Sequence, residues 1–136
     1  DAVFIVAPVH GEKHHAAITH FPRRHAEVLT RRPAALISVS LHAASGEAED
    51  IEEMRAYVDG FCSDTGWLPR ETHYAAGALR FSEFDFFKKW IARRLAASLQ
   101  MEIRPGEDVE FTDWRALESF ADAFMATHVT QSAETA

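Results

Sequence analysis

The sequence has little of what marks several common protein classes. Cys62 is the single cysteine among 136 residues, so no disulfide can form within the chain, which suits a reducing compartment. The sequence has 14 Lys and Arg residues and 21 Asp and Glu residues, which gives a formal net charge of −7. This balance argues against nucleic acid as a partner, because phosphates require a basic surface. We also find no signal peptide and no apolar run of about 18 residues that could cross a bilayer.

Motifs for metal, phosphate and covalent catalysis are also lacking. Neither the GxxxxGK nor the GxGxxG pattern of phosphate-binding loops occurs. Residues 14–25 include four histidines, but the spacing of these histidines does not suit a metal site on any predicted element, and we expect no metal. No Ser-His-Asp set or carboxylate pair stands out, so we predict no catalytic side chain. Cys62 follows Phe61 on a predicted helix and is expected to pack rather than to act as a nucleophile.

What the sequence does contain is an alternation of short apolar segments and longer periodic ones. Strands are predicted at residues 2–7, 34–41 and 72–79. The first is apolar without alternation, which favours a strand buried on both faces of a parallel sheet.

Helical spacing of apolar residues fills the intervals between and after these strands. A first helix ends before Pro33, a second carries an acidic first turn, a third spans 82–100, and a last begins at Thr112 or Asp113. The buried faces are expected to contain Ala17, Phe21, His25, Val28 and Leu29 in the first helix, Ile51, Met54, Val58 and Phe61 in the second, and Trp114, Leu117, Phe120, Ala121 and Phe124 in the last. The order predicts a parallel sheet with right-handed crossovers.

Ligands of open parallel sheets bind outside the carboxyl ends of the strands. Two segments there are rich in small and polar residues, and a third begins at Gly77. The predicted cofactor-binding residues are Pro8, Val9, His10, Gly11, Glu12, Lys13 and His14 after the first strand, and Ser40, Leu41, His42, Ala43, Ala44, Ser45 and Gly46 after the second. Simple turns use the same residue types, so composition alone leaves both interpretations open.

Four segments, in order, resemble a known family. They are VFIVAPVHGEKHHAA (3–17), SVSL (38–41), AGALRF (76–81) and FTDW (111–114). Together they are similar to the third, fourth and fifth strands and the start of the last helix in the flavodoxin-like, menaquinone-dependent protoporphyrinogen IX dehydrogenases. The resemblance extends from about residue 2 to residue 128.

The resemblance implies a fold in the α/β class: a flavodoxin-like, doubly wound parallel sheet with helices on both faces. The family's first two strands and its phosphate loop would precede Asp1, so we expect them to be missing from this chain. It further implies a partial domain over 1–129, a family insertion over about 81–109, and a polar tail over 130–136. FMN is the implied cofactor, with the two segments flanking its ring. His10, His14 and His42 would contact the ring or substrate; alternatively, they are solvent-exposed loop histidines.

The implied activity is the oxidation of protoporphyrinogen IX to protoporphyrin IX in haem biosynthesis, with a membrane quinone as acceptor. Two alternatives stay open: a flavodoxin-type electron carrier or quinone reductase without porphyrin activity, and a flavin-free interaction domain that kept the fold.

The helix predicted at 82–100 bears on where the protein works. It combines an aromatic, apolar face with Lys88, Lys89, Arg93 and Arg94. This pattern is typical of a peripheral membrane contact. Together with the membrane quinone of the resembling family, it predicts a cytoplasmic protein that binds to the cytoplasmic face of the inner membrane. An ordinary core helix with a solvated basic face would look the same.

Overall fold

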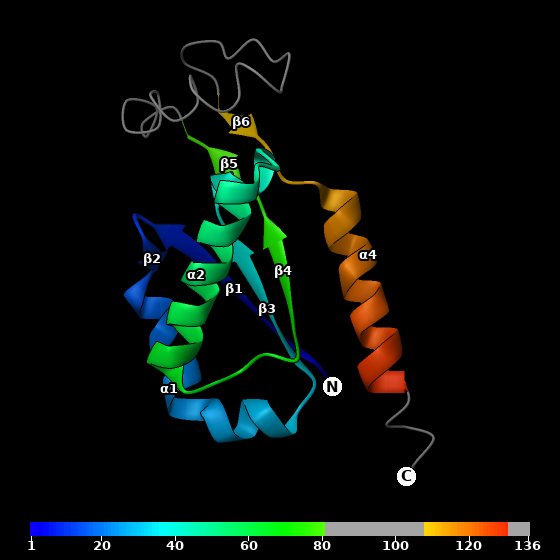
Figure 1. Cartoon of the computed structure of the whole chain (residues 1–136). Helices are drawn as coiled ribbons and strands as arrows, with labels where there is room; N and C mark the ends of the chain where they lie inside the picture. The colour runs from blue at the N-terminus through cyan, green and yellow to red at the C-terminus, as the bar shows by residue number, and fades with distance from the viewer. Residues whose placement is uncertain (81–107, 131–136) are drawn as a thin grey trace.

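The computed structural model describes residues 1–80 and 108–130 (Figure 1). The helix expected at 82–100 and nearly all of the expected polar tail lie outside these residues. The elements are β1 (Val3–His10), β2 (Lys13–His14), α1 (Ala16–Arg31), β3 (Ala34–Val39), η1 (Leu41–Ala44), α2 (Ala48–Thr65), β4 (Glu71–Ala75), β5 (Ala78–Leu79), β6 (Val109–Glu110), α4 (Trp114–Met125) and the π-helical turn η3 (Ala126–Thr130).

Four strands form the main sheet in the order β2-β1-β3-β4. The three long strands are parallel: β1 pairs with β3 from Val3–Ala34 to Pro8–Val39, and β3 pairs with β4 up to Val39–Ala75. The expected parallel arrangement is therefore confirmed for these strands. The sheet is mixed rather than wholly parallel, because β2 joins β1 in the antiparallel sense.

Helices cover both faces of this sheet, as expected. α1 and α2 lie on one face and α4 on the other (Figure 1). Alternation along β1 supplies both layers: Ile5 belongs to the core cluster with Leu29 and Phe61, whereas the Phe4 ring lies 5.3 Å from that of Phe124. Burying each large side chain of this kind contributes about 1.5–3 kcal/mol. In the described chain, no helix has the length and apolar character needed to cross a membrane.

Of the face predicted for the first helix, Leu29 alone is buried. Phe21 and Val28 are 52% and 51% exposed, and the buried residues are Thr19, Pro22 and Leu29. The helix contains Pro22 and departs from helical angles at His25. Because a kink changes the direction of the helix, a single stripe of side chains cannot face the sheet along its whole length.

Burial also differs from the prediction on the α4 face of the sheet. Val6 of β1 is 52% exposed, so this strand is not buried on both faces. Trp114, expected in the buried face of the last helix, is 62% exposed, whereas Phe124 is fully buried. Trp114 opens α4 just after its N-cap, Asp113, and the packing against Phe4 comes from Phe120 and Phe124, further along the helix.

Two predicted strands end earlier than expected. β3 stops at Val39, because Ser40 caps η1 and Leu41 belongs to that turn. β4 stops at Ala75, and β5 pairs with β6 in a separate two-stranded sheet. Gly77, between β4 and β5, has a φ of 78°. This backbone conformation interrupts a strand, and residues other than glycine rarely adopt it.

One edge of β1 is open in the described structure. On the side away from β3, the paired residues of β1 are Val9 and His10, which meet β2. That the family's first two strands are missing from this chain stays a prediction.

Candidate functional site

The candidate site lies at the carboxyl ends of β1, β3 and β4, which meet at one edge of the sheet because the strands are parallel. β1 continues into a hairpin, β3 into η1, and β4 into the Gly77 corner. Each of these connections is fixed by contacts that the sequence alone did not reveal.

The segment after the first strand is a hairpin rather than an open loop. Pro8, Val9 and His10 still belong to β1, and Lys13 and His14 form β2. Gly11, with a φ of 68°, makes the turn between them. The backbone of this segment is therefore held by strand pairing before any ligand is considered.

His14 fastens the hairpin to the sheet. Its Nε2 hydrogen-bonds with the Ser38 hydroxyl of β3 at 2.9 Å, and its ring lies 5.0 Å from that of Phe61. Burial lowers the pKa of His14 by desolvating the imidazolium, and a backbone hydrogen bond at Tyr57 partly opposes this effect. His14 is thus a neutral, buried anchor on the α2 side of the sheet, which leaves little of its ring to contact a ligand.

His10 is the exposed histidine among the three candidates for ring contact. Its ring packs edge-on against His15 at 5.5 Å. Gly11, Glu12 and Lys13 are exposed beside it. The hairpin therefore offers a ligand the stretch from His10 to Lys13, whereas His14 faces inward.

The segment after the second long strand is a 3-10 turn tied to β4. The Ser40 N–H donates to the Ala75 carbonyl at 2.9 Å. The Ser40 hydroxyl hydrogen-bonds with His42 Nδ1 at 2.8 Å and accepts from the His42 N–H. The residues from Leu41 to Ser45 are half-buried, and Gly46 is exposed with a φ of 68°.

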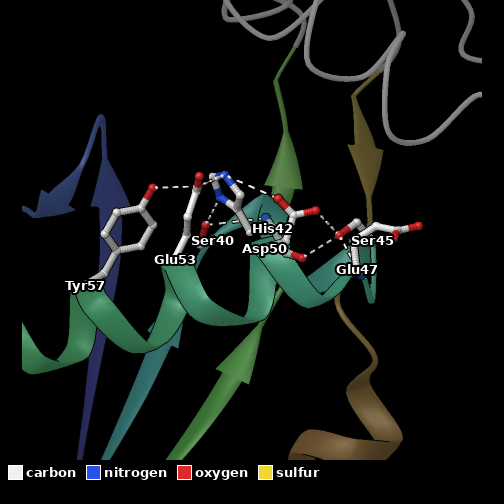
Figure 2. Close-up of polar contacts among 7 residues, drawn as sticks. All are labelled: Ser40, His42, Ser45, Glu47, Asp50, Glu53 and Tyr57. Atoms are coloured by element: carbon white, nitrogen blue, oxygen red, sulfur yellow. Dashed lines mark hydrogen bonds and ion pairs between the residues drawn. The ribbon is translucent and has the colours of Figure 1, made fainter.

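His42 points toward α2, where it meets two carboxylates (Figure 2). Its Nε2 lies 2.9 Å from Glu53 Oε2 and 3.8 Å from Asp50 Oδ1. The Tyr57 hydroxyl donates to the same Glu53 oxygen at 3.3 Å. Burial, together with the charge of Glu53, raises the pKa of Tyr57.

Asp50 is the functional candidate that sequence reasoning missed. It was grouped with the acidic first turn of the second helix, yet it is fully buried and accepts a hydrogen bond from the Ser45 hydroxyl. Its spacing of three from Glu53 places both carboxylates on one helix face. That spacing, with a histidine on the turn just before the helix, is the signal that could have found the group.

The Gly77 corner closes the site on its third side. A Cβ at Gly77 would lie 2.8 Å from Val39 Cγ1. The Gly77 N–H donates to the Thr112 hydroxyl at 3.1 Å, and the Phe111 N–H donates to the Gly77 carbonyl at 2.9 Å. These bonds join the end of β4 to the approach to α4.

Comparisons with known proteins agree with this fold. The family model described as "Flavodoxin domain" matches residues 1–107. Protoporphyrinogen IX dehydrogenase [quinone] of Escherichia coli K12 is 27% identical over 121 residues, and its namesake in Leishmania major is 26% identical over 111 residues.

These matches include 89% and 82% of this chain but 66% and 48% of the relatives, so the chain spans less than two thirds of the length of either one. No solved structure gives a significant match. Because the family model covers well over half of the chain, the protein belongs to the flavodoxin domain family, with distant relatives among the protoporphyrinogen IX dehydrogenases.

Proposed function

We propose that the protein is an FMN-dependent oxidoreductase that oxidises protoporphyrinogen IX to protoporphyrin IX and passes the electrons to a quinone. The family and the names of the two relatives support the reaction. The structural observation that carries the proposal is the position of two glycine-containing segments at the carboxyl ends of the neighbouring strands β1 and β3. Flavodoxin-like sheets hold their flavin at this edge.

Both proposed ring-binding segments contain a glycine with open space beside it. Gly11 and Gly46 both have a φ of 68°, and a Cβ at either would meet nothing within 4 Å, so backbone N–H groups can approach a ligand there. Residues 10–13 would border one side of the ring and residues 41–46 the other. These two segments are proposed to hold the isoalloxazine part of the cofactor.

FMN would supply the redox chemistry, and the protein would supply binding and orientation. His14 and Ser38 keep the hairpin in place, and Ser40 with its bond to Ala75 keeps η1 in place. His10 is the exposed side chain best placed to contact the ring or the substrate.

A flavin titration tests the binding step. Purified protein should quench FMN fluorescence, and Ala43→Leu in η1 should weaken binding at least tenfold because it narrows the ring site. Ala43 is a better probe than Gly46, where any side chain would also strain the left-handed backbone. Ala56→Leu, on the exposed surface of α2, is the control and should bind FMN normally. Absence of quenching by the parent protein would overturn the proposal.

A second measurement separates the enzyme from the alternatives. With FMN and a menaquinone analogue present, the protein should convert protoporphyrinogen IX into fluorescent protoporphyrin IX. Quinone reduction by another electron donor without porphyrin formation would assign the protein to the carriers or quinone reductases instead.

A further inference from the structure

We propose that His42, Asp50 and Glu53 form a binding site for a divalent transition-metal ion, with Zn²⁺ as the best-matched ion. The three residues come from η1 and the first two turns of α2, and their side chains point toward one another where η1 meets α2 (Figure 2). The site does not depend on the flavin proposal, because the His42 side chain points toward α2 and the two carboxylates belong to that helix.

The spacing of the donor atoms suits a small ion. One nitrogen and two carboxylate oxygens all lie within 4.8 Å of one another. Donors at about 2.1 Å from a tetrahedral ion are separated by about 3.4 Å. The two distances from His42 Nε2, 2.9 Å to Glu53 and 3.8 Å to Asp50, bracket that separation. The carboxylate oxygens of Asp50 and Glu53 also lie within 4.8 Å of each other, so modest side-chain adjustments would complete a three-ligand site with a fourth position left for water.

Neighbouring hydroxyls orient each ligand, as is usual around bound metals. Ser40 occupies His42 Nδ1 at 2.8 Å, which leaves Nε2 directed at the carboxylates. Ser45 donates to Asp50 Oδ2, so Oδ1 is the oxygen that faces His42. Tyr57 donates to Glu53 Oε2. Such second contacts fix the donor atoms before an ion arrives.

Charge and exposure favour a cation at this position. Two carboxylates can neutralise a divalent ion, and imidazole with carboxylate is a donor set that Zn²⁺ accepts. The Asp50 side chain is 1% exposed, His42 is 20% exposed and Glu53 is 44% exposed. The buried Asp50 carboxylate provides a fixed ligand shielded from water, and the partly exposed Glu53 leaves a path by which the ion can enter.

Cobalt provides a direct test, because tetrahedrally bound Co²⁺ absorbs visible light. Metal-stripped protein titrated with Co²⁺ should develop a visible band that saturates at one ion per chain, and Zn²⁺ should abolish it. His42→Gln and Glu53→Gln should each weaken binding at least tenfold. Both variants are close in size to the parent residues, and Glu53 is exposed enough for its variant to keep the fold.

His128→Gln is the matched control. His128 Nε2 lies 2.6 Å from Glu71 Oε1, yet this pair belongs to no three-ligand group in the described chain. Its variant should bind Co²⁺ as the parent does. If His42→Gln fails to fold by circular dichroism, Glu53→Gln decides. The proposal is overturned if the parent binds no stoichiometric Co²⁺, or if binding survives the folded variants, which would assign it to other histidines such as His10 and His15.

Discussion

His14 is a single side chain with opposite roles in the sequence and in the structure. The sequence places it among loop residues that could meet a ligand, whereas the structure buries it against Ser38 and Phe61. Because burial lowers the pKa of His14 below its ordinary value of 6.5, the unfolded chain binds a proton more readily than the folded one near that pH. The free energy of unfolding should then fall as the pH drops below about 6.5.

Replacing His14 with Gln should flatten this pH dependence. We expect the stability of His14→Gln, measured by urea denaturation between pH 7 and pH 5, to decline less steeply than that of the parent. Part of the slope will remain, because burial also lowers the pKa of His73. His20→Gln changes an exposed histidine and should keep the parental slope. An unchanged slope in His14→Gln would contradict the buried, neutral state.

The candidate site was predictable from the sequence in position but not in orientation. The carboxyl ends of the first two strands follow from their apolar runs, and the segments around Gly11 and Gly46 do lie at these ends; that they bind a cofactor stays a prediction. The inward turn of His14 and His42 depends on Ser38 of the neighbouring strand and on Asp50 and Glu53 of α2. Such partners become neighbours through tertiary folding, which residue spacing does not encode.

The secondary-structure elements also combine features that the local sequence predicts with features that tertiary contacts determine. The start of β3 at Ala34 follows directly from Pro33, a local signal. The end of β4 depends on Gly77, whose two hydrogen bonds reach residues 111 and 112. Local patterns therefore predicted where these strands begin, and long-range contacts determined where they end.

Gly77→Ala should be costly because two effects coincide. The residue has a φ of 78°, and its new Cβ would lie 2.8 Å from Val39 Cγ1. Left-handed strain and overpacking together are expected to lower the free energy of unfolding by about 2–4 kcal/mol, measured by chemical denaturation. Gly60→Ala is the control: it lies within α2 with nothing within 4 Å of its Cβ, and it should stabilise by about 0.5–1 kcal/mol. Equal changes in the free energy of unfolding for Gly77→Ala and Gly60→Ala would contradict the structural role assigned to the turn at Gly77.

At the scale of the whole molecule, the edge of β1 that is unpaired among the described residues favours self-association. Strands with unpaired N–H and C=O groups recruit other chains. The face beside this edge also exposes Val6, at 52%. Self-association through β1 is the expected consequence when the edge has no covering partner.

Val6→Lys should reduce this self-association. A lysine on an edge strand disfavours pairing with a second edge, and the half-exposed position should tolerate it. We expect a lower weight-average mass by light scattering at a matched concentration. Val28→Lys is the control, because Val28 is 51% exposed but lies on α1. A similar decrease in both variants would attribute association to general hydrophobicity.

The small sheet of β5 and β6 has a consequence for engineering. β5 and β6 lie side by side (Figure 1), and Ala78 pairs with Glu110 while Leu79 pairs with Val109, so residues 79 and 109 are direct neighbours. The entropy of closing the intervening stretch grows only logarithmically with its length, about 0.6 kcal/mol for each doubling. A reporter or affinity module inserted between Leu79 and Val109 should therefore lower the free energy of unfolding only slightly and leave the parallel sheet intact.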